Sequence, residues 1–310
     1  MNWDVFVQQL VNGLTLGSVY ALIALGYSMV YGILKLLNFA HGEVYMIGAF
    51  IGYGVLTASG GPTDPMFPVW LLLPFMFIAA MIGAGLLGVV VERFAYRPLR
   101  TAPRIAPLIS ALGVSFFLQN TALLLFSADY RSYSTVSLDN GSLFLHGIDW
   151  GPLHISLIRI IVIVTTAALM VGLTLFVSRT QVGKAMRATA YDREAAAMMG
   201  INVDRVIVVT FLIGSALAGA AGVMVGLVFQ RVYHFMGFTA GLKGFTAAVV
   251  GGIGSIPGAM LGGILIGLAE SFAQGYASTR FYDLIVFAIL IVVLIVRPTG
   301  LLGKPDVNKV

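Results

Sequence analysis

The longest polar segment of the chain covers residues 179–205 and lies between two long apolar stretches. It carries five basic and three acidic side chains, whereas only 10% of the 310 residues are charged. This composition suits protein recognition, because alanines allow close approach to a groove and charges fix the register. A cytoplasmic motor protein can bind a membrane pore at such a segment. The alternative, and the commoner structure for this pattern, is a solvated amphipathic loop helix.

The same segment predicts a short helix followed by a corner. Good helix formers run from Gly183 to Met199. Gly200 is the residue type expected just after a helix C terminus. Asn202 can cap the next helix, and Asp204 suits its first turn. We therefore expect one helix, a glycine corner and re-entry into an apolar segment.

Two further clusters interrupt apolar segments. Residues 38–43 (NFAHGE) contain an amide, an imidazole and a carboxylate, which are costly at membrane depth. They indicate a water-lined break or hinge, or, equally, a position at the membrane surface. Residues 251–258 (GGIGSIPG) cannot continue a regular helix. They indicate a broken helix at a transport site, or a tight turn. The residues predicted for a path or hinge are Asn38, His41, Glu43, Lys243, Gly251, Gly252, Gly254 and Pro257.

A faint internal repeat connects the two halves of the chain. Residues 17–18 (GS) precede residues 39–42 (FAHG) by about the interval that separates 214–215 (GS) from 238–241 (FTAG). The repeat predicts two halves that run in opposite directions through the membrane.

By this repeat Glu43 and Lys243 occupy near-equivalent positions with opposite charge, and we expect both to face the interior of the bundle. Glu270 is expected to reach the membrane interface instead. The charged residues expected only to anchor span ends are Arg159, Arg280 and Asp283.

Composition defines the elements that must hold these residues. Hydrophobic residues make up 59% of the chain and the mean hydropathy is +0.96, whereas soluble domains contain roughly 25% charged residues. Long apolar runs without strand-like alternation predict an all-α polytopic membrane protein. The absence of cysteine excludes disulfides, thiolate chemistry and cysteine metal sites. The expected segments are 11–34, 40–58, 69–91, 105–127, 156–178, 206–229, 240–256, 258–275 and 281–297.

The seventh segment is short, so eight or nine spans are expected. Loop 92–104 and segment 179–205 are rich in Lys and Arg, whereas loop 128–155 carries Arg131 against three aspartates. The positive-inside rule places the two basic regions in the cytoplasm and loop 128–155 in the periplasm. Nine spans then put the N terminus outside and the basic C terminus inside.

Small residues at four-residue spacing predict close packing of helix backbones. They are Gly13 and Gly17, Gly48 and Gly52, Gly263 and Gly267, and the series Gly214, Ala218, Gly222 and Gly226.

Five segments carry a family pattern: 15–50 (TLGSVYALIALGYSMVYGILKLLNFAHGEVYMIGAF), 92–100 (ERFAYRPLR), 183–206 (GKAMRATAYDREAAAMMGINVDRV), 243–263 (KGFTAAVVGGIGSIPGAMLGG) and 297–303 (RPTGLLG). Together they resemble the LivH-type permeases of branched-chain amino acid ABC importers. The resemblance covers nearly the whole chain. Residues 194–200 (EAAAMMG) match the core of the coupling motif of such permeases, but its downstream Ile-x-Leu-Pro is absent.

The resemblance implies a single permease domain over residues 1–310, with segment 179–205 as a cytoplasmic coupling loop, in a bacterial inner membrane. It implies four kinds of partner or ligand: a second homologous permease, two ABC ATPase subunits, a periplasmic solute-binding protein, and leucine, isoleucine or valine as cargo. The residues expected to couple to the ATPase are Gly183, Arg187, Asp192, Arg193, Glu194, Ala195, Ala196 and Gly200.

The chain contains no G-x-x-x-x-G-K-[ST] phosphate loop. We therefore expect it to be a transporter subunit that is not itself an enzyme and binds no cofactor, with ATP and Mg²⁺ on the partner ATPases. The expected cycle is alternating access driven by their closure.

Three alternatives are open. The same machinery could import urea, short amides or other amino acids. An autonomous ion-coupled transporter would use His41, Glu43 and Lys243 as ion groups, but it has no need of a coupling loop. A passive channel is disfavoured because no ring of charges or filter-like repeat is visible.

Overall fold

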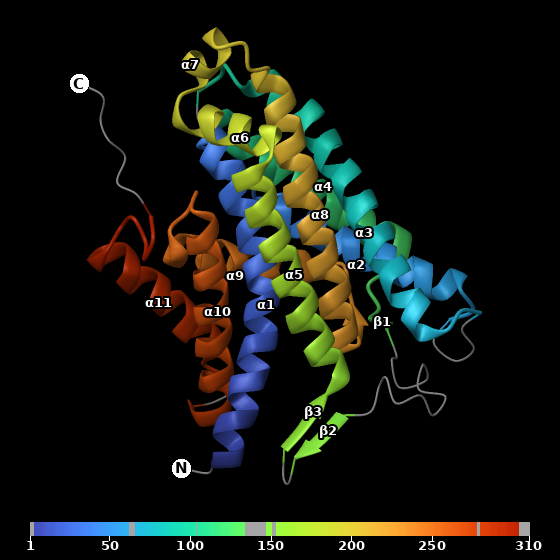
Figure 1. Ribbon diagram of the computed structural model, residues 1–310. Coiled ribbons are helices and arrows are strands. Elements are labelled where there is room, and N and C mark those ends of the chain that lie inside the picture. The colour runs from blue at the N-terminus through green and yellow to red at the C-terminus, as the bar shows by residue number, and fades with distance from the viewer. Residues whose placement is uncertain are drawn as a thin grey trace.

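The computed structural model describes residues 3–61, 66–103, 105–133, 147–150, 153–277 and 280–303, and these form a bundle of long helices (Figure 1). The helices are α1 (Trp3–Leu34), α2 (His41–Ala58), α3 (Val69–Val91), α4 (Ile105–Phe126), α5 (Leu157–Arg179), α6 (Gln181–Tyr191), α7 (Arg193–Met198), α8 (Val203–Phe229), α9 (Met236–Gly251), α10 (Ile256–Phe272) and α11 (Tyr282–Val296). Irregular helical turns follow α3 at Glu92–Tyr96 and Arg97–Leu99, and α10 at Ala273–Ala277.

The strands are short and antiparallel. Strand β1 (Arg131–Ser132) pairs with β4 (Arg231–Val232), and β2 (Gly147–Trp150) pairs with β3 (Leu153–Ser156). These pairs lie at the end of the bundle where α8 finishes (Figure 1).

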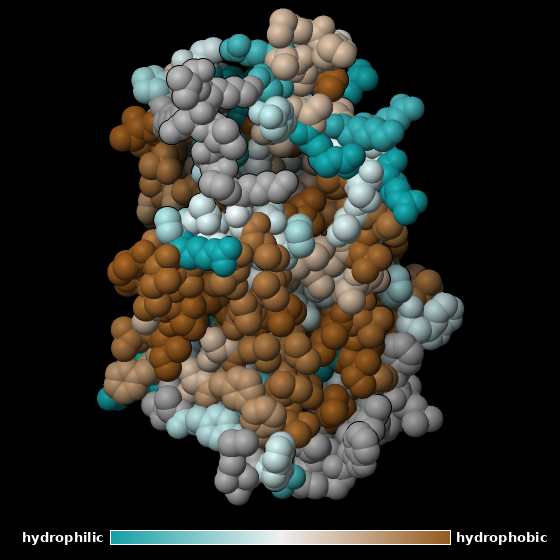
Figure 2. Space-filling model, turned by 60° about the vertical axis from the view of Figure 1, so that its left-hand side comes forward, coloured by the Kyte–Doolittle hydropathy of each residue, from teal (hydrophilic) through white to brown (hydrophobic). Residues whose placement is uncertain are grey.

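Among the described residues, six helices are long and apolar enough to cross a membrane: α1, α3, α4, α5, α8 and α10. Figure 2 shows a broad hydrophobic band across the middle of one face of the molecule. Apolar side chains such as Leu284 and Ile295 of α11 face outward, with exposed fractions of 64% and 76%. Such a surface suits lipid, and the helices satisfy their own backbone groups. The chain is therefore an all-α polytopic membrane protein, as predicted.

The molecule has two distinct ends (Figure 1). At one end, called here the α6–α7 end, lie α6, α7, the turns after α3 and the C-terminal end of α1. The opposite end holds the start of α1 and the β2–β3 hairpin. Four charged residues used for the predicted orientation lie outside the described residues. They are Arg104 of loop 92–104, Asp139 of loop 128–155, and Lys304 and Lys309 of the C terminus.

Helix α1 is the central element, because it packs against α10, α8 and α9 and is buried along most of its length. Its contact with α10 is a contact between backbones. A Cβ atom at Gly13 would lie 2.8 Å from Cα of Leu268, and one at Gly17 would lie 2.8 Å from Cα of Ile264. The spacing of small residues therefore predicted close packing correctly.

The glycine-rich cluster at 251–258 forms a tight turn between α9 and α10. Of the two predicted structures, a broken helix and a tight turn, the second is therefore the one observed. Gly252 and Gly254 have φ angles of +112° and +88°, which glycine adopts without strain. Ser255 accepts from the Gly258 amide at 3.2 Å and Pro257 lies in the first turn of α10. The amides of Leu301 and Leu302 bond to the end of α9, each at 2.9 Å, and hold the C-terminal segment on this turn.

The backbone contact predicts a selective effect of one methyl group. In Gly267→Ala the new Cβ overlaps the backbone of Gly17, so the helices must separate, at a cost of about 1–3 kcal/mol. In the control Gly172→Ala on α5, the Cβ meets no atom within 4 Å. Thermal unfolding in detergent should show a lower Tm for the first variant only, and equal Tm values would contradict the close α1–α10 packing.

Candidate functional site

The polar segment forms two helices, α6 and α7, so the predicted single helix over 183–199 is wrong. Asp192 separates them, with extended dihedral angles of φ −155° and ψ 114°. Its Oδ1 accepts from the amides of Glu194 at 3.0 Å and Ala195 at 3.1 Å. Aspartate is a preferred N-cap because it satisfies such free amides. The cap turns α7 into a separate projection from the bundle (Figure 1).

The corner after α7 agrees with the prediction. Gly200 has φ +82°, the left-handed conformation that ends many helices. Asn202 caps α8 by accepting from the Arg205 amide at 2.9 Å, and Asp204 lies in the first turn of α8.

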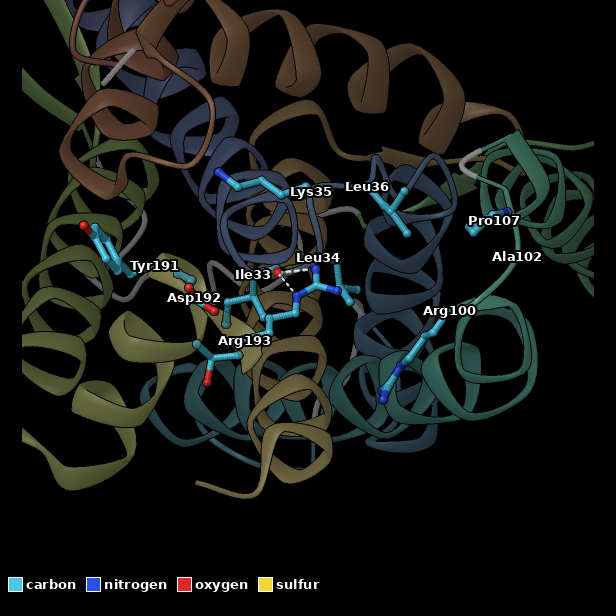
Figure 3. A pocket seen from close by; sticks show the side chains of 12 residues that line it. Ile33, Leu34, Lys35, Leu36, Arg100, Ala102, Pro107, Tyr191, Asp192 and Arg193 are labelled. Carbon is cyan, nitrogen blue, oxygen red and sulfur yellow. Dashed lines mark hydrogen bonds between the residues drawn. The ribbon is translucent and has the colours of Figure 1, made fainter. Parts of the chain in front are cut away.

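Three predicted coupling residues attach the segment to the bundle. Arg187 donates to the carbonyl of Val177, and a Cβ at Gly183 would overlap the same carbonyl. Arg193 donates through Nε to the carbonyl of Ile33 at 2.8 Å, at the end of α1 (Figure 3). Burial, and to a lesser extent the charge of Arg100, lowers the pKa of Arg193 below its usual value. These side chains connect α6 and α7 to α5 and α1.

The outward-facing part of α7 is different. Glu194 and Ala195 are exposed, whereas Ala196 is buried. Met198 and Met199 are 82% and 84% exposed, and sequence reasoning had not selected them. Two adjacent apolar side chains at the tip of a polar projection are a signal for protein contact. The coupling role of all these residues stays a prediction.

A cavity of about 340 Å³ lies beside this attachment (Figure 3). It is bounded by the end of α1, by Arg100 and Pro107, and by residues 189–193 at the junction of α6 and α7. The junction is therefore accessible from the surface at the α6–α7 end.

An ion network joins the turn after α3 to the start of α8. Glu92 is fully buried and pairs with Arg100, which also pairs with Asp204. Arg97 bonds to Asp204 at 3.0 Å on the exposed side. A buried carboxylate depends strongly on its cation, so Arg100 fixes this end of the bundle.

The cluster at 38–43 is buried inside the bundle. Asn38, His41 and Glu43 are only 2%, 1% and 1% exposed, so these side chains lie inside the protein, and their depth in the membrane stays a prediction. The His41 ring lies against Gly26, about two turns before the end of α1. The α2 helix therefore starts inside the bundle, not at its surface.

Partners for this cluster come from α4 and the turn after α3. Tyr96 Oη lies 3.0 Å from Oδ1 of Asn38, and Ser115 donates to Oε1 of Glu43 at 3.3 Å. Within the described part of the chain, Oε2 of Glu43 and Nε2 of His41 have no hydrogen-bond partner.

Lys243 is the centre of a second buried cluster. Its Nζ lies 2.8 Å from Oε1 of Glu270 and 2.8 Å from Oδ1 of Asp283. It also lies 4.5 Å from the centre of the Tyr282 ring. Tyr20 donates to Oε2 of Glu270 at 2.9 Å. The predicted burial of Lys243 is confirmed.

The interfacial position predicted for Glu270 is wrong, because this residue is 3% exposed. Packing of α10 against α1 and α9 places its carboxylate beside Tyr20 and Lys243. Asp283 likewise pairs with Lys243 and is more than an anchor. Glu270 and Asp283 are far from Lys243 in sequence. The one sequence feature that indicated them was a charged residue within an apolar run.

A helical bundle with an apolar surface, a projecting helix at one end and buried ionic clusters defines a class: a polytopic transporter subunit. Residues 9–294 match the family described as branched-chain amino acid transport system, permease component. The chain belongs to this family, and the resemblance found in the sequence is confirmed.

Curated relatives agree over the full length. The chain is 46% identical over 308 residues to the high-affinity branched-chain amino acid transport system permease protein LivH of Escherichia coli K12. It is 47% identical over 305 residues to the corresponding permease protein BraD of Pseudomonas aeruginosa. Each alignment covers 98% of both chains. Permease protein LivM of E. coli K12 is 27% identical, over 93% of this chain and 68% of LivM.

The buried ion pair between Arg100 and Glu92 can be tested by replacing one partner and then both. Arg100→Met leaves Glu92 unpaired in the interior, which should cost about 3–5 kcal/mol of stability. Arg97→Met removes only an exposed contact to Asp204 and should cost about 1 kcal/mol or less. The double variant Arg100→Met, Glu92→Leu should recover much of the loss. Thermal unfolding measures all three, and equal losses for Arg97 and Arg100 would contradict the assignment.

Proposed function

We propose that the chain is the permease subunit of an ATP-driven importer for leucine, isoleucine and valine. Family membership over nearly the whole chain carries the proposal, because the relatives that match at full length are named for branched-chain amino acid transport. The bundle, in a bacterial inner membrane, supplies the path and couples it to ATP hydrolysis elsewhere.

The proposed partners are a second permease, two ABC ATPases and a periplasmic binding protein. LivH and LivM of one organism are both named permease proteins of the high-affinity system, and this chain resembles both. That supports a pairing of two homologous permeases. The exposed tip of α7 supports docking to an ATPase, which binds ATP and Mg²⁺. Closure of the ATPases then moves α7 and, through Arg193, α1.

The proposed orientation puts the α6–α7 end in the cytoplasm. The basic region 92–100 and segment 179–205 lie together at this end, which supports their placement inside by the positive-inside rule. Loop 128–155 and the N terminus are then periplasmic, and nine crossings put the C terminus inside. Helices α2 and α9 are short for crossings, because each begins within the bundle.

We further propose an inverted repeat of α1–α3 with α8–α10. Helix α1 packs on α10 as α8 packs on α3. Lys35 after α1 and Gln230 after α8 both adopt left-handed φ, of 54° and 56°. Helices α2 and α9 each start six residues further on. Their second residues meet, since a Cβ at Gly42 would overlap the carbonyl of Gly237. In this register Glu43 and Lys243 are not equivalent.

Uptake by the reconstituted transporter tests the function. Proteoliposomes holding the chain with its genomic neighbours should take up labelled leucine when ATP and the binding protein are supplied. Uptake of urea in place of leucine would contradict leucine as the cargo and support the alternative in which the same machinery imports urea. Uptake by this chain alone, driven by a proton gradient, would contradict ATP coupling.

The tip of α7 should be essential for coupling. Met198→Glu places a charge in the proposed contact, and we expect stimulated ATP hydrolysis to fall about tenfold, equivalent to about 1.4 kcal/mol. The control Met66→Glu changes a methionine of similar exposure, 74%, three residues before the start of α3 and outside α6 and α7. ATPase activity and co-purification of the ATPase measure the effect. Full activity of the Met198 variant would show that α7 is not the docking element.

A further inference from the structure

A second cavity, of about 380 Å³, lies in the half of the bundle away from the α6–α7 end. It is bounded by α1, α2, α9 and α10, and by the last turns of α8 around Phe229, a helix that starts beside α7. The volume falls within the range of small-molecule sites, roughly 300–1,000 Å³.

The lining of this cavity is divided by chemistry. One wall is apolar and consists of Leu16, Val19, Val225 and Phe229. The other side of the lining is polar and includes three charged residues, Arg231, Lys243 and Glu270, with Tyr282 beside Lys243. A site with an apolar wall and a few converging polar groups is the usual form of a small-molecule pocket.

The two carboxylates that bind Lys243 are held to different degrees. Glu270 has a 4% exposed side chain and also accepts from Tyr20 and Gln274. The Asp283 side chain is 51% exposed and belongs to α11, where Val286 alone is buried among the described residues. Asp283 is therefore the replaceable partner of Lys243.

Lys243 binds two carboxylates, although one carboxylate is enough to neutralise its ammonium group. Lys243, Glu270 and Asp283 together carry one excess negative charge beside the cavity. Ionisable groups within a membrane bundle are costly, and they mark substrate or ion paths. The arrangement leaves an ammonium-binding charge available when another carboxylate occupies Lys243.

We propose that this cavity binds an α-amino acid with an aliphatic side chain during its passage through the membrane. The ligand carboxylate takes the place of Asp283 on Nζ of Lys243. The ligand ammonium faces the released Asp283 carboxylate and the ring of Tyr282, which attracts cations. The aliphatic side chain packs on the apolar wall. The identity of the amino acid rests on the proposed function.

The absence of cysteine in the chain allows a direct test. Thr239 lines the cavity and is exposed; Thr57 is exposed in the last turn of α2, outside the cavity lining. Thr239→Cys and Thr57→Cys are compared in the complete membrane complex without binding protein, using a water-soluble thiosulfonate. L-leucine at about four times its Kd should slow labelling of the first by about fivefold, because the site is then about four-fifths occupied, and should leave the second unchanged.

Ligand analogues and variants test the assigned contacts. L-leucinamide, which lacks the carboxylate, and the α-keto acid of leucine, which lacks the ammonium, should not protect. Lys243→Gln in the Thr239→Cys background should abolish protection. Asp283→Asn, at an exposed position, should lower the leucine concentration needed for protection, because a competing carboxylate is removed.

Unchanged labelling of Thr239→Cys by leucine, or no labelling at all while Thr57→Cys reacts, overturns the site. Protection that persists in Lys243→Gln overturns the contact to Lys243. ATP-driven leucine uptake, measured on the same preparations, separates the two proposals: with uptake intact and no protection, only the site fails. Without uptake in the unsubstituted complex, the proposed function fails.

Discussion

Lipid supplies no hydrophobic force between helices, so this bundle depends on direct contact between backbones. Helix α1 provides the central contact: Gly13 and Gly17 allow α10 to approach within a distance that excludes any Cβ, and Gly26 leaves space for the ring of His41 on α2. Dispersion forces and packing at this range replace the hydrophobic effect. The depth at which α2 and α9 begin, and hence the positions of Glu43 and Lys243, follows from this packing.

The two buried polar clusters have different characters. The cluster of Asn38, His41 and Glu43 lies at the start of α2, with atoms that lack partners in the described structure. The cluster around Lys243 is saturated with carboxylates and borders a cavity. Unsatisfied atoms at a helix start suit a hinge that changes partners, whereas an ion group beside a cavity suits a ligand. The proposed path therefore involves the second cluster, and the first is available for conformational change.

The proposed energy input and the proposed cargo site lie in different halves of the molecule. They share α1, which accepts a hydrogen bond from Arg193 at Ile33 and contributes Tyr20 to the Lys243 cluster. A helix buried along most of its length moves as a rigid element, because its neighbours leave no space for local distortion. A displacement of α7 would thus reach the cavity through α1 without any contact between α7 and the cargo.

The sequence by itself determined the class of the protein, the approximate limits of its helices and its family, because hydropathy, glycine spacing and motifs are local properties. The sequence also contained the signal for the break between α6 and α7, because Asp192 is of a residue type that is preferred at the N-cap. The partner of Lys243 was decided only by the tertiary structure. Glu270 and Asp283 lie on other helices, and no sequence interval specifies which faces of α9, α10 and α11 meet. Which helix faces meet depends on side-chain packing around α1, and this packing exists only in the folded chain.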